Sequence, residues 1–300
     1  MRIAYLIMTH SNPRLLKRVV QRLSTENSGF FIHVDKKVDQ GEFLKVKGTN
    51  VQFLNERVPV YWGDYSQVEA TLLLIREALT SNVRYDYLVQ LNASDYPIRS
   101  AQYIESYFVK NRGAEFIALV KIPNNDAGKP IERINTIRYE HRHFVRARII
   151  RALGKIGLDQ RDHRRFLKGL DPYAGNGWWA LSRDACLYID TFSQCNPEFV
   201  KFFRHTVVPH ESFFHTILGN SDFAPKIQRH LHYEDWSDGG PSPSMLSLEH
   251  INQLELQGEV FADDIWGKCE LLFARKFSDK NISLVDRVDA MIERKEGYST

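Results

Sequence analysis

The feature that most constrains this chain is the alternation of strand-like and helix-like segments over its first hundred residues. Residues 2–8 form an apolar run typical of a buried strand, and from Pro13 apolar residues recur at the spacing of an amphipathic helix. Two further apolar runs, 30–34 and 51–54, precede a second helical pattern that starts at Ser66, and another strand-like run, 87–91, stops at a polar turn. Asn12, Ser66 and Ser182 are possible N-caps of helices. Strands separated by helices predict an α/β fold with a mostly parallel sheet flanked by helices.

Length and composition exclude several classes of protein. A chain of 300 residues with 43% hydrophobic content can bury a full core, and we predict a single domain over residues 1–300. The net charge of +3 does not require a nucleic-acid partner, and we expect none. Three cysteines fit neither a disulfide framework nor zinc-ligand spacing. No apolar run reaches the ~20 residues that a membrane-spanning helix needs. We therefore expect a cytoplasmic protein.

Polar residues follow the predicted strands where ligands bind in parallel sheets. His10, Asp35 and Asp95 come directly after three of these apolar runs, at the carboxyl edge of the expected sheet. Asp35 either contacts a ligand or closes the turn before the two lysines that follow it. Asp95 either accepts hydrogen bonds from ligand hydroxyls or caps the turn at Tyr96.

One carboxylate and one pair of cations are candidates for chemistry. Glu211 follows Pro209 and precedes an apolar run, so it is expected at a helix N-terminus, and Arg275 and Lys276 concentrate positive charge downstream. The chain contains no Asp-x-Asp sequence that would hold a divalent cation. This combination suits the expulsion of a diphosphate without a metal ion. The structural alternatives are a first-turn glutamate stabilised by the helix dipole and a solvated strand end.

The stretch 138–168 differs in composition from its surroundings. It holds ten Lys or Arg and three acids, with Ile149, Ile150, Leu153 and Ile156 interleaved. This pattern predicts a basic amphipathic helix. The helix either presents a solvated face or contacts an anionic acceptor or a membrane-linked lipid carrier.

Seven short segments carry a family resemblance, in order, between residues 3 and 278. They are IHVDKK at 32–37, WGDYSQV at 62–68, SDYPI at 94–98, GWWALSR at 177–183, PHESFF at 209–214, DW at 235–236 with PSP at 241–243, and FARKF at 273–277. Together they resemble the core-2/I-branching glycosyltransferases, a family that also includes the peptide O-xylosyltransferases.

The resemblance implies a GT-A-like fold, a UDP-sugar donor, inversion at the anomeric carbon and no divalent metal cofactor. The family's catalytic base, in its Pro-Asp-Glu motif, falls on Glu211, although His210 stands where the family has Asp. The family's diphosphate-binding Lys falls on Lys276. A second family Arg has no counterpart near residues 250–256, and Arg275 is expected to supply that charge. Because neighbours on a strand point to opposite faces, at most one of the two cations is expected to reach the donor, and we favour Lys276.

The resemblance also implies where the donor binds. It places the uracil near Ile7 and Thr9 and against Asp35, whose carboxylate could accept the imide hydrogen. Trp62 and Asp95 complete the expected donor site.

Aromatic side chains are expected to bind the acceptor, because sugars present flat apolar faces. The candidates are Trp178, Trp179 and Trp236. Since adjacent residues of a strand point to opposite faces, one of Trp178 and Trp179 is expected in the core and the other in the cleft.

The sequence therefore predicts an inverting, metal-independent glycosyltransferase. We expect it to move N-acetylglucosamine, or alternatively xylose, from a UDP donor to a hydroxyl of a glycan or lipid-linked saccharide. We also expect peripheral contact with the inner membrane face through residues 138–168. A non-catalytic carbohydrate-binding protein of the same fold is the alternative from another class, since it would keep the tryptophans and need no base.

Overall fold

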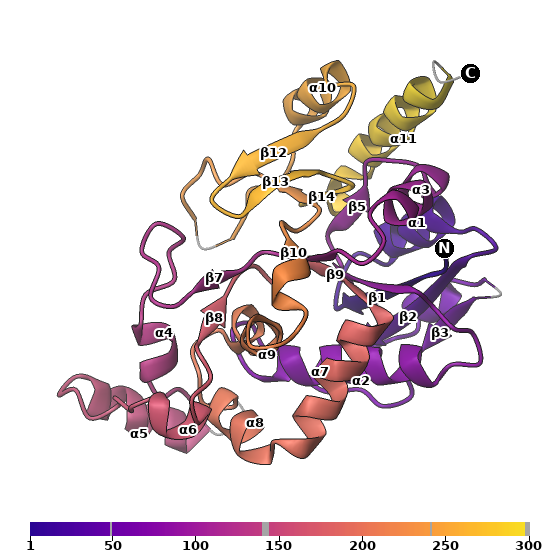
Figure 1. The fold of residues 1–300 in the computed structure, drawn as a ribbon. Helices are drawn as coiled ribbons and strands as arrows, with labels where there is room; N and C mark the ends of the chain where they lie inside the picture. Colours follow the sequence, from indigo (N-terminus) through magenta and orange to yellow (C-terminus); the bar gives the residue numbers. More distant parts are fainter. Residues whose placement is uncertain (49, 140–143, 241, 298–300) are drawn as a thin grey trace.

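The computed structural model describes residues 1–300 except 49, 140–143, 241 and 298–300, and it confirms the predicted α/β fold (Figure 1). Seven strands form the main sheet in the order β10-β6-β9-β4-β1-β2-β3. β9 is antiparallel to both its neighbours, and the other pairs are parallel. The bounds are Ile3–Thr9 for β1, Ser28–Val34 for β2, Val51–Phe53 for β3, Tyr87–Asn92 for β4, Glu115–Ile117 for β6, Trp179–Ser182 for β9 and Ile227–Gln228 for β10.

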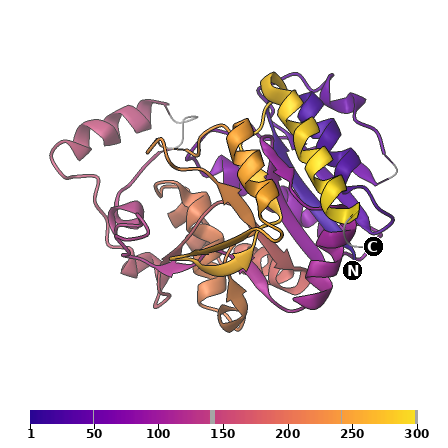
Figure 2. The same cartoon turned by 90° about the horizontal axis from the view of Figure 1, so that it is seen from above.

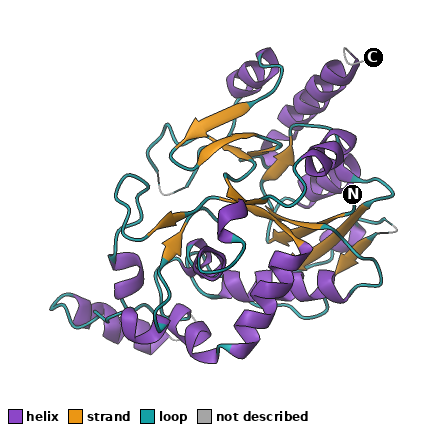
Figure 3. Cartoon of the chain, in the orientation of Figure 1, coloured by secondary structure: helices purple, strands orange, loops and turns teal. Residues whose placement is uncertain are grey.

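Helices cover both faces of this sheet and enclose two hydrophobic cores (Figure 3). One core lies under α1 (Pro13–Leu23), α3 (Ala101–Lys110), α10 (Leu248–Leu256) and α11 (Ile282–Gly297). The other lies under α2 (Ser66–Thr80), α7 (Arg183–Cys195), α8 (Pro197–Phe203) and α9 (Phe213–Gly219). Successive side chains of strand β1 point to opposite faces of the sheet, so this strand contributes to both cores. Ile3, Tyr5 and Ile7 enter the first core, whereas Ala4 and Leu6 enter the second.

The structure bears on three residues predicted to cap the N-termini of helices. Ser182 caps α7 as predicted, because its hydroxyl accepts a hydrogen bond from the amide of Ala185. Ser66 begins α2 but does not cap it, and its hydroxyl instead accepts the amide of Tyr61. Asn12 precedes α1 without capping it. The carboxylate of Asp279 accepts the amides at the start of α1, so a residue from the far end of the chain provides the cap.

Smaller sheets stand beside the carboxyl edge of the main sheet. Three strands, β11 (His232–Glu234), β14 (Phe273–Arg275) and β5 (Asp95–Pro97), form one of them in that order. Two antiparallel pairs are β12 (Phe261–Asp264) with β13 (Gly267–Glu270), which are adjacent in sequence, and β7 (Val120–Lys121) with β8 (Tyr173–Ala174), which are not. Single 3₁₀ turns are η1 (Phe43–Lys45), η3 (Pro209–Glu211), η4 (Ala224–Lys226) and η5 (Asp279–Asn281).

The basic stretch 138–168 contains two helices, joined by turns and irregular chain. It follows α4 (Glu132–Asn135) and contains α5 (Phe144–Gly154) and α6 (Arg164–Leu167), while residues 140–143 lie outside the described part. Among all the helices described, none combines the length and the apolar composition that crossing a bilayer requires.

Candidate active site

A cavity of about 1230 Å³ opens at the carboxyl ends of the parallel strands. The carboxyl ends of three strands contribute residues to its wall: Thr9 and His10 at the end of β1, His33 and Asp35 at the end of β2, and Asn92 and Ser94 at the end of β4. This is the edge at which open α/β sheets bind ligands. Pockets for one small ligand measure roughly 300–1,000 Å³. The cavity is therefore larger than the usual pocket for one small ligand.

Glu211 lines this cavity, in a local structure that differs from the prediction. The residue ends the 3₁₀ turn η3, and α9 begins two residues later at Phe213, so Glu211 is not in the first turn of an α-helix. Val208, just before this turn, has a φ of 49°, a left-handed conformation that β-branched residues rarely adopt. The helix that was expected to begin at Glu211 therefore begins only at Phe213.

Two cations hold the carboxylate of Glu211. The Nζ of Lys129 and the Nη1 of Arg133 each donate to its Oε2 at 2.6 Å. Lys129 is only 5% exposed, whereas the side chain of Arg133 is partly exposed, and both line the cavity. Because both ion pairs fall on Oε2, the other carboxylate oxygen is left for a reacting group.

These charges set the protonation of Glu211. Burial raises the pKa of this carboxyl, but the positive charges of Lys129 and Arg133 and the field of His210 outweigh burial and lower the pKa to about 2. Burial also lowers the pKa of the Lys129 ammonium, against the opposing attraction of Glu211. The carboxylate is therefore ionised throughout the neutral range and able to accept a proton, although it is a weak base.

Arg275 is held by an acid behind the cavity wall. Its Nη1 lies 3.0 Å from Oδ1 of Asp95, and its guanidinium carbon lies 4.1 Å from the centre of the Trp178 ring. Burial raises the pKa of Asp95, but the charge of Arg275 and contact with His232 outweigh burial and keep the pKa below its usual value. Asp95 itself is 1% exposed and is not among the cavity-lining residues. It contacts Arg275 rather than the space that a donor would fill.

Lys276 lines the same wall as Arg275. Its Nζ donates to the hydroxyl of Ser242 at 2.8 Å, and burial together with the nearby Arg275 lowers the pKa of its ammonium. Both cations line the cavity, because β14 ends at Arg275 and strand alternation does not extend to Lys276. That only one of them reaches the donor stays a prediction. Lys276 differs from Arg275 in that no acid is paired with it among the described residues.

The other predicted donor residues are divided between the cavity and the core. Thr9, Asp35 and Trp62 line the cavity, and Trp62 is largely exposed. Oδ1 of Asp35 accepts the backbone amides of Lys37 and Val60, which is the turn-closing role, while the residue still borders the cavity. Ile7 does not line the cavity, because the alternation along β1 directs its side chain into the core under α1.

The three candidate tryptophans all border the cavity but differ in burial. Trp179 is 2% exposed and packs in the core against Phe214, whereas Trp178 forms part of the wall beside Arg275. Trp236 is 48% exposed, and its Nε1 donates to Oε2 of Glu234 at 2.8 Å. Burial raises the pKa of Glu234 to about 7.

The cations that hold Glu211 are absent from the sequence predictions. Lys129 and Arg133 lie 82 and 78 residues before Glu211, in a loop and a short helix without a distinctive pattern. No local spacing could have paired them with the glutamate. Trp266, from the loop between β12 and β13, also lines the cavity, and no local sequence pattern predicted this position.

The arrangement brings one ionised carboxylate and several fixed cations to one cavity. In the part of the chain that the structure describes, no three His, Cys, Asp or Glu side chains gather in a way that could bind a metal ion. Such a site can accept a proton at Glu211 and stabilise an anion at Lys276 and Arg275.

A comparison with protein families identifies this combination of fold and cavity. The model of the core-2/I-branching enzyme family matches residues 3–258. The chain belongs to this family. Its members are glycosyltransferases, which is the class that the sequence motifs predict.

Curated relatives of this family member are named as xylosyltransferases. The xylosyltransferase oxt of Drosophila pseudoobscura pseudoobscura is 26% identical over 92% of this chain and 31% of the relative. Xylosyltransferase 2 of Homo sapiens is 29% identical over 73% of the chain and 25% of the relative, and the xylosyltransferase of Ciona intestinalis is 25% identical over 96% and 34%. The chain therefore spans about a third of the length of these relatives or less.

Proposed function

We propose that this family member transfers a sugar from a UDP donor to a hydroxyl group of a glycan, with inversion and without a divalent metal ion. The observation that carries the proposal is the shared cavity, in which Glu211 lies on one wall and Lys276 and Arg275 on another. A binding protein would use the tryptophans alone and would have no need of an ionised carboxylate at the same cavity.

Glu211 is the proposed general base. The acceptor oxygen forms a bond to the anomeric carbon while the bond between that carbon and the β-phosphate oxygen breaks, and the acceptor hydrogen passes to Glu211. Lys129 and Arg133 orient the carboxylate through Oε2, so Oε1 is the atom that takes the proton. The protonated glutamate then releases the proton to solvent, to which the site is partly open.

Lys276 is the proposed stabiliser of the leaving group. Negative charge grows on the β-phosphate as the bond breaks, and a fixed cation in a water-poor cavity stabilises that charge without reorganisation. Lys276 donates only to a serine hydroxyl in the structure, which a phosphate oxygen can replace. Arg275 adds positive charge beside it, although Asp95 neutralises part of that charge.

The donor sugar that we now favour is xylose. The names of the curated relatives support this alternative over N-acetylglucosamine, for which no comparison gives support. The acceptor is proposed to lie against the exposed ring of Trp236 and the wall formed by Trp178, because sugar faces pack on aromatic rings. A saccharide carried on a lipid at the inner face of a membrane remains our proposed acceptor.

A donor screen tests this function. UDP release would be measured for UDP-xylose, UDP-N-acetylglucosamine and other UDP-sugars, with water and with simple glycans as acceptors. We expect release from at least one donor by the parent protein and a fall of at least 100-fold in Glu211→Gln. Glu132→Gln, which changes an exposed acid outside the cavity, should retain the parent rate. Sugar binding without UDP release from any donor would instead support a non-catalytic protein.

A further inference from the structure

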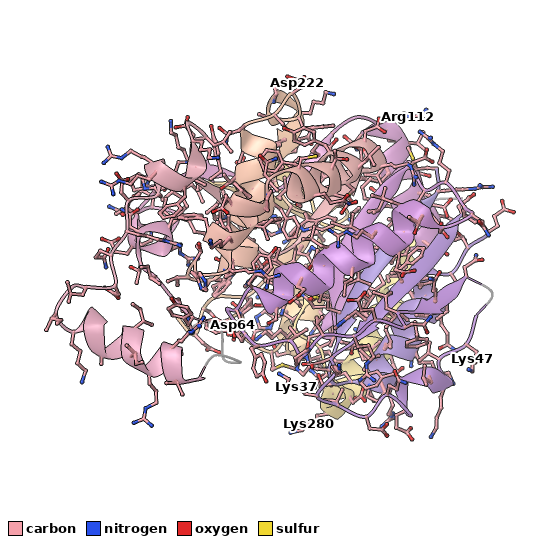
Figure 4. All side chains as sticks on the ribbon, turned by 90° about the horizontal axis from the view of Figure 1, so that it is seen from below. Lys37, Lys47, Asp64, Arg112, Asp222 and Lys280 are labelled. Atoms are coloured by element: carbon pink, nitrogen blue, oxygen red, sulfur yellow. The ribbon has the colours of Figure 1, made fainter. Side chains whose placement is uncertain are left out.

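Helix α5 stands apart from the rest of the molecule. Figure 2 shows it at one side of the chain, and Figure 4, from the opposite direction, shows its side chains reaching into open space. The helix follows α4, whose Arg133 lines the cavity, so the projecting segment is attached close to the candidate active site.

An apolar stripe runs along the exposed side of this segment. Val145 is 68% exposed, Ile149 is 55% exposed and Ile156, just past the helix, is 70% exposed, with the exposed Ala152 between them. On α5, positions 145, 149 and 152 are separated by four and three residues, which places them on one face of the helix, and Ile156 follows two residues beyond the helix end. Leu158 continues the apolar surface beyond the end of the helix. Because exposure of large apolar side chains to water is unfavourable, such a row indicates a surface that binds an apolar partner.

Basic side chains are exposed along the same segment of the chain, between residues 146 and 168. Exposed cations on α5, α6 and the segments that follow them are Arg146, Lys155, Arg164, Arg165 and Lys168. The described acids of this region are Asp159 and Asp162, and Asp162 is already paired with Arg164. An acidic polymer would pair with these cations but leave Val145 and Ile149 in water. A bilayer surface with anionic headgroups satisfies the apolar stripe and the cations together.

We propose that α5 docks this protein on an anionic lipid surface, with the stripe at 145, 149, 152 and 156 inserted at the boundary between headgroups and acyl chains and the cations at the phosphate level. We infer lipid binding from the exposed side chains of residues 145–168, and this inference does not depend on sugar transfer. Its consequence for catalysis rests on the proposed function: docking would bring the cavity beside α4 to the level at which a lipid-linked acceptor is presented.

Vesicle sedimentation tests the docking surface. The full-length protein would be mixed with vesicles of phosphatidylcholine alone or of phosphatidylcholine with about a third phosphatidylglycerol. We expect binding to the anionic vesicles, weaker binding at higher salt, and little binding to the neutral ones. The double variant Val145→Glu/Ile149→Glu should bind at least tenfold more weakly. The matched control is Leu187→Glu, an exposed leucine on α7 that should bind like the parent.

Further measurements separate the alternatives. UDP release with a soluble acceptor should be equal in Val145→Glu/Ile149→Glu and in the parent, since neither residue lines the cavity. Equal vesicle binding by the double variant and the parent would overturn the proposal. So would binding of dextran sulfate without binding of vesicles, which would identify an acidic polymer, or self-association that the double variant abolishes, which would identify a second copy of the chain.

Discussion

Arg133 and Glu211 are separated by 78 residues in the sequence, yet Nη1 of the arginine lies 2.6 Å from Oε2 of the glutamate. With Lys129 on the same oxygen, the proposed base is ordered by two cations and its pKa is lowered to about 2. A base this weak removes a proton efficiently only when the acceptor hydroxyl has already become acidic in the transition state. Stabilisation of the departing diphosphate must therefore carry much of the catalysis.

Removing the charge of Arg133 should make Glu211 a stronger base. In Arg133→Gln the pKa of Glu211 rises, because one of the charges that lowers it is gone. The glutamate must be ionised to act, so the acid limb of the kcat/KM profile should move to higher pH. The measurement is kcat/KM between pH 3.5 and 8. Arg112→Gln, an exposed arginine outside the cavity, should keep the parent profile, and an unmoved limb in Arg133→Gln would contradict the assignment.

The ion pair between Lys129 and Glu211 should also be visible in stability. Glu211→Gln leaves the buried ammonium of Lys129 without its carboxylate, which costs about 3 kcal/mol of unfolding free energy. The double variant Glu211→Gln/Lys129→Met removes both charges and should recover a large part of that loss. Urea denaturation at pH 7 measures both. If the double variant were less stable than Glu211→Gln by the full cost of Lys129→Met alone, the two residues would not be coupled.

Local sequence patterns identified the elements of this fold, and contacts distant in sequence decided the details. The apolar residues of 2–8 and 13–23 predicted β1 and α1, because a segment that buries one or both of its faces needs apolar residues at those positions. The cap of α1 could not be predicted in the same way. Asp279, more than 260 residues away, accepts the amides that Asn12 was expected to accept.

In the candidate site, too, short motifs predicted some residues, whereas contacts distant in sequence determined others. Glu211 and Lys276 were found from short motifs, and both line the cavity. The family resemblance placed Ile7 near the donor, but the alternation of side chains along β1 directs Ile7 into the core. Lys129 and Arg133 carry no local signal, since only the folded chain brings them to Glu211.

The buried His33 should make the fold sensitive to acid. Its Nε2 accepts the amide of Val58 at 3.0 Å, and burial lowers its pKa from 6.5 to about 4. Because the folded pKa lies below the unfolded one, its contribution to stability is complete above pH 6.5. It is lost as the pH falls from 6.5 towards 4, by up to ~1.4 kcal/mol per pH unit.

Substitution of His33 isolates this contribution. His33→Gln keeps a hydrogen-bond acceptor for Val58 but cannot take up the proton, so the unfolding free energy should fall less steeply between pH 6.5 and 4 than in the parent. Denaturant titrations at several pH values give the slope. His10→Gln, at an exposed histidine, should leave the slope as it is in the parent, and equal slopes in His33→Gln and the parent would refute the prediction.

The central claim is that protein cations, and not a divalent metal ion, stabilise the departing UDP. The most direct measurement is the rate of UDP release with excess EDTA and with added Mn²⁺, in the parent, in Lys276→Met and in the control Lys36→Met, whose exposed lysine lies outside the cavity. We predict that EDTA leaves the parent rate unchanged, that Lys276→Met lowers it by about 10²–10³-fold, and that Mn²⁺ does not restore it. Loss of parent activity in EDTA with recovery in Mn²⁺, or a Lys276→Met rate equal to that of Lys36→Met, would contradict the account.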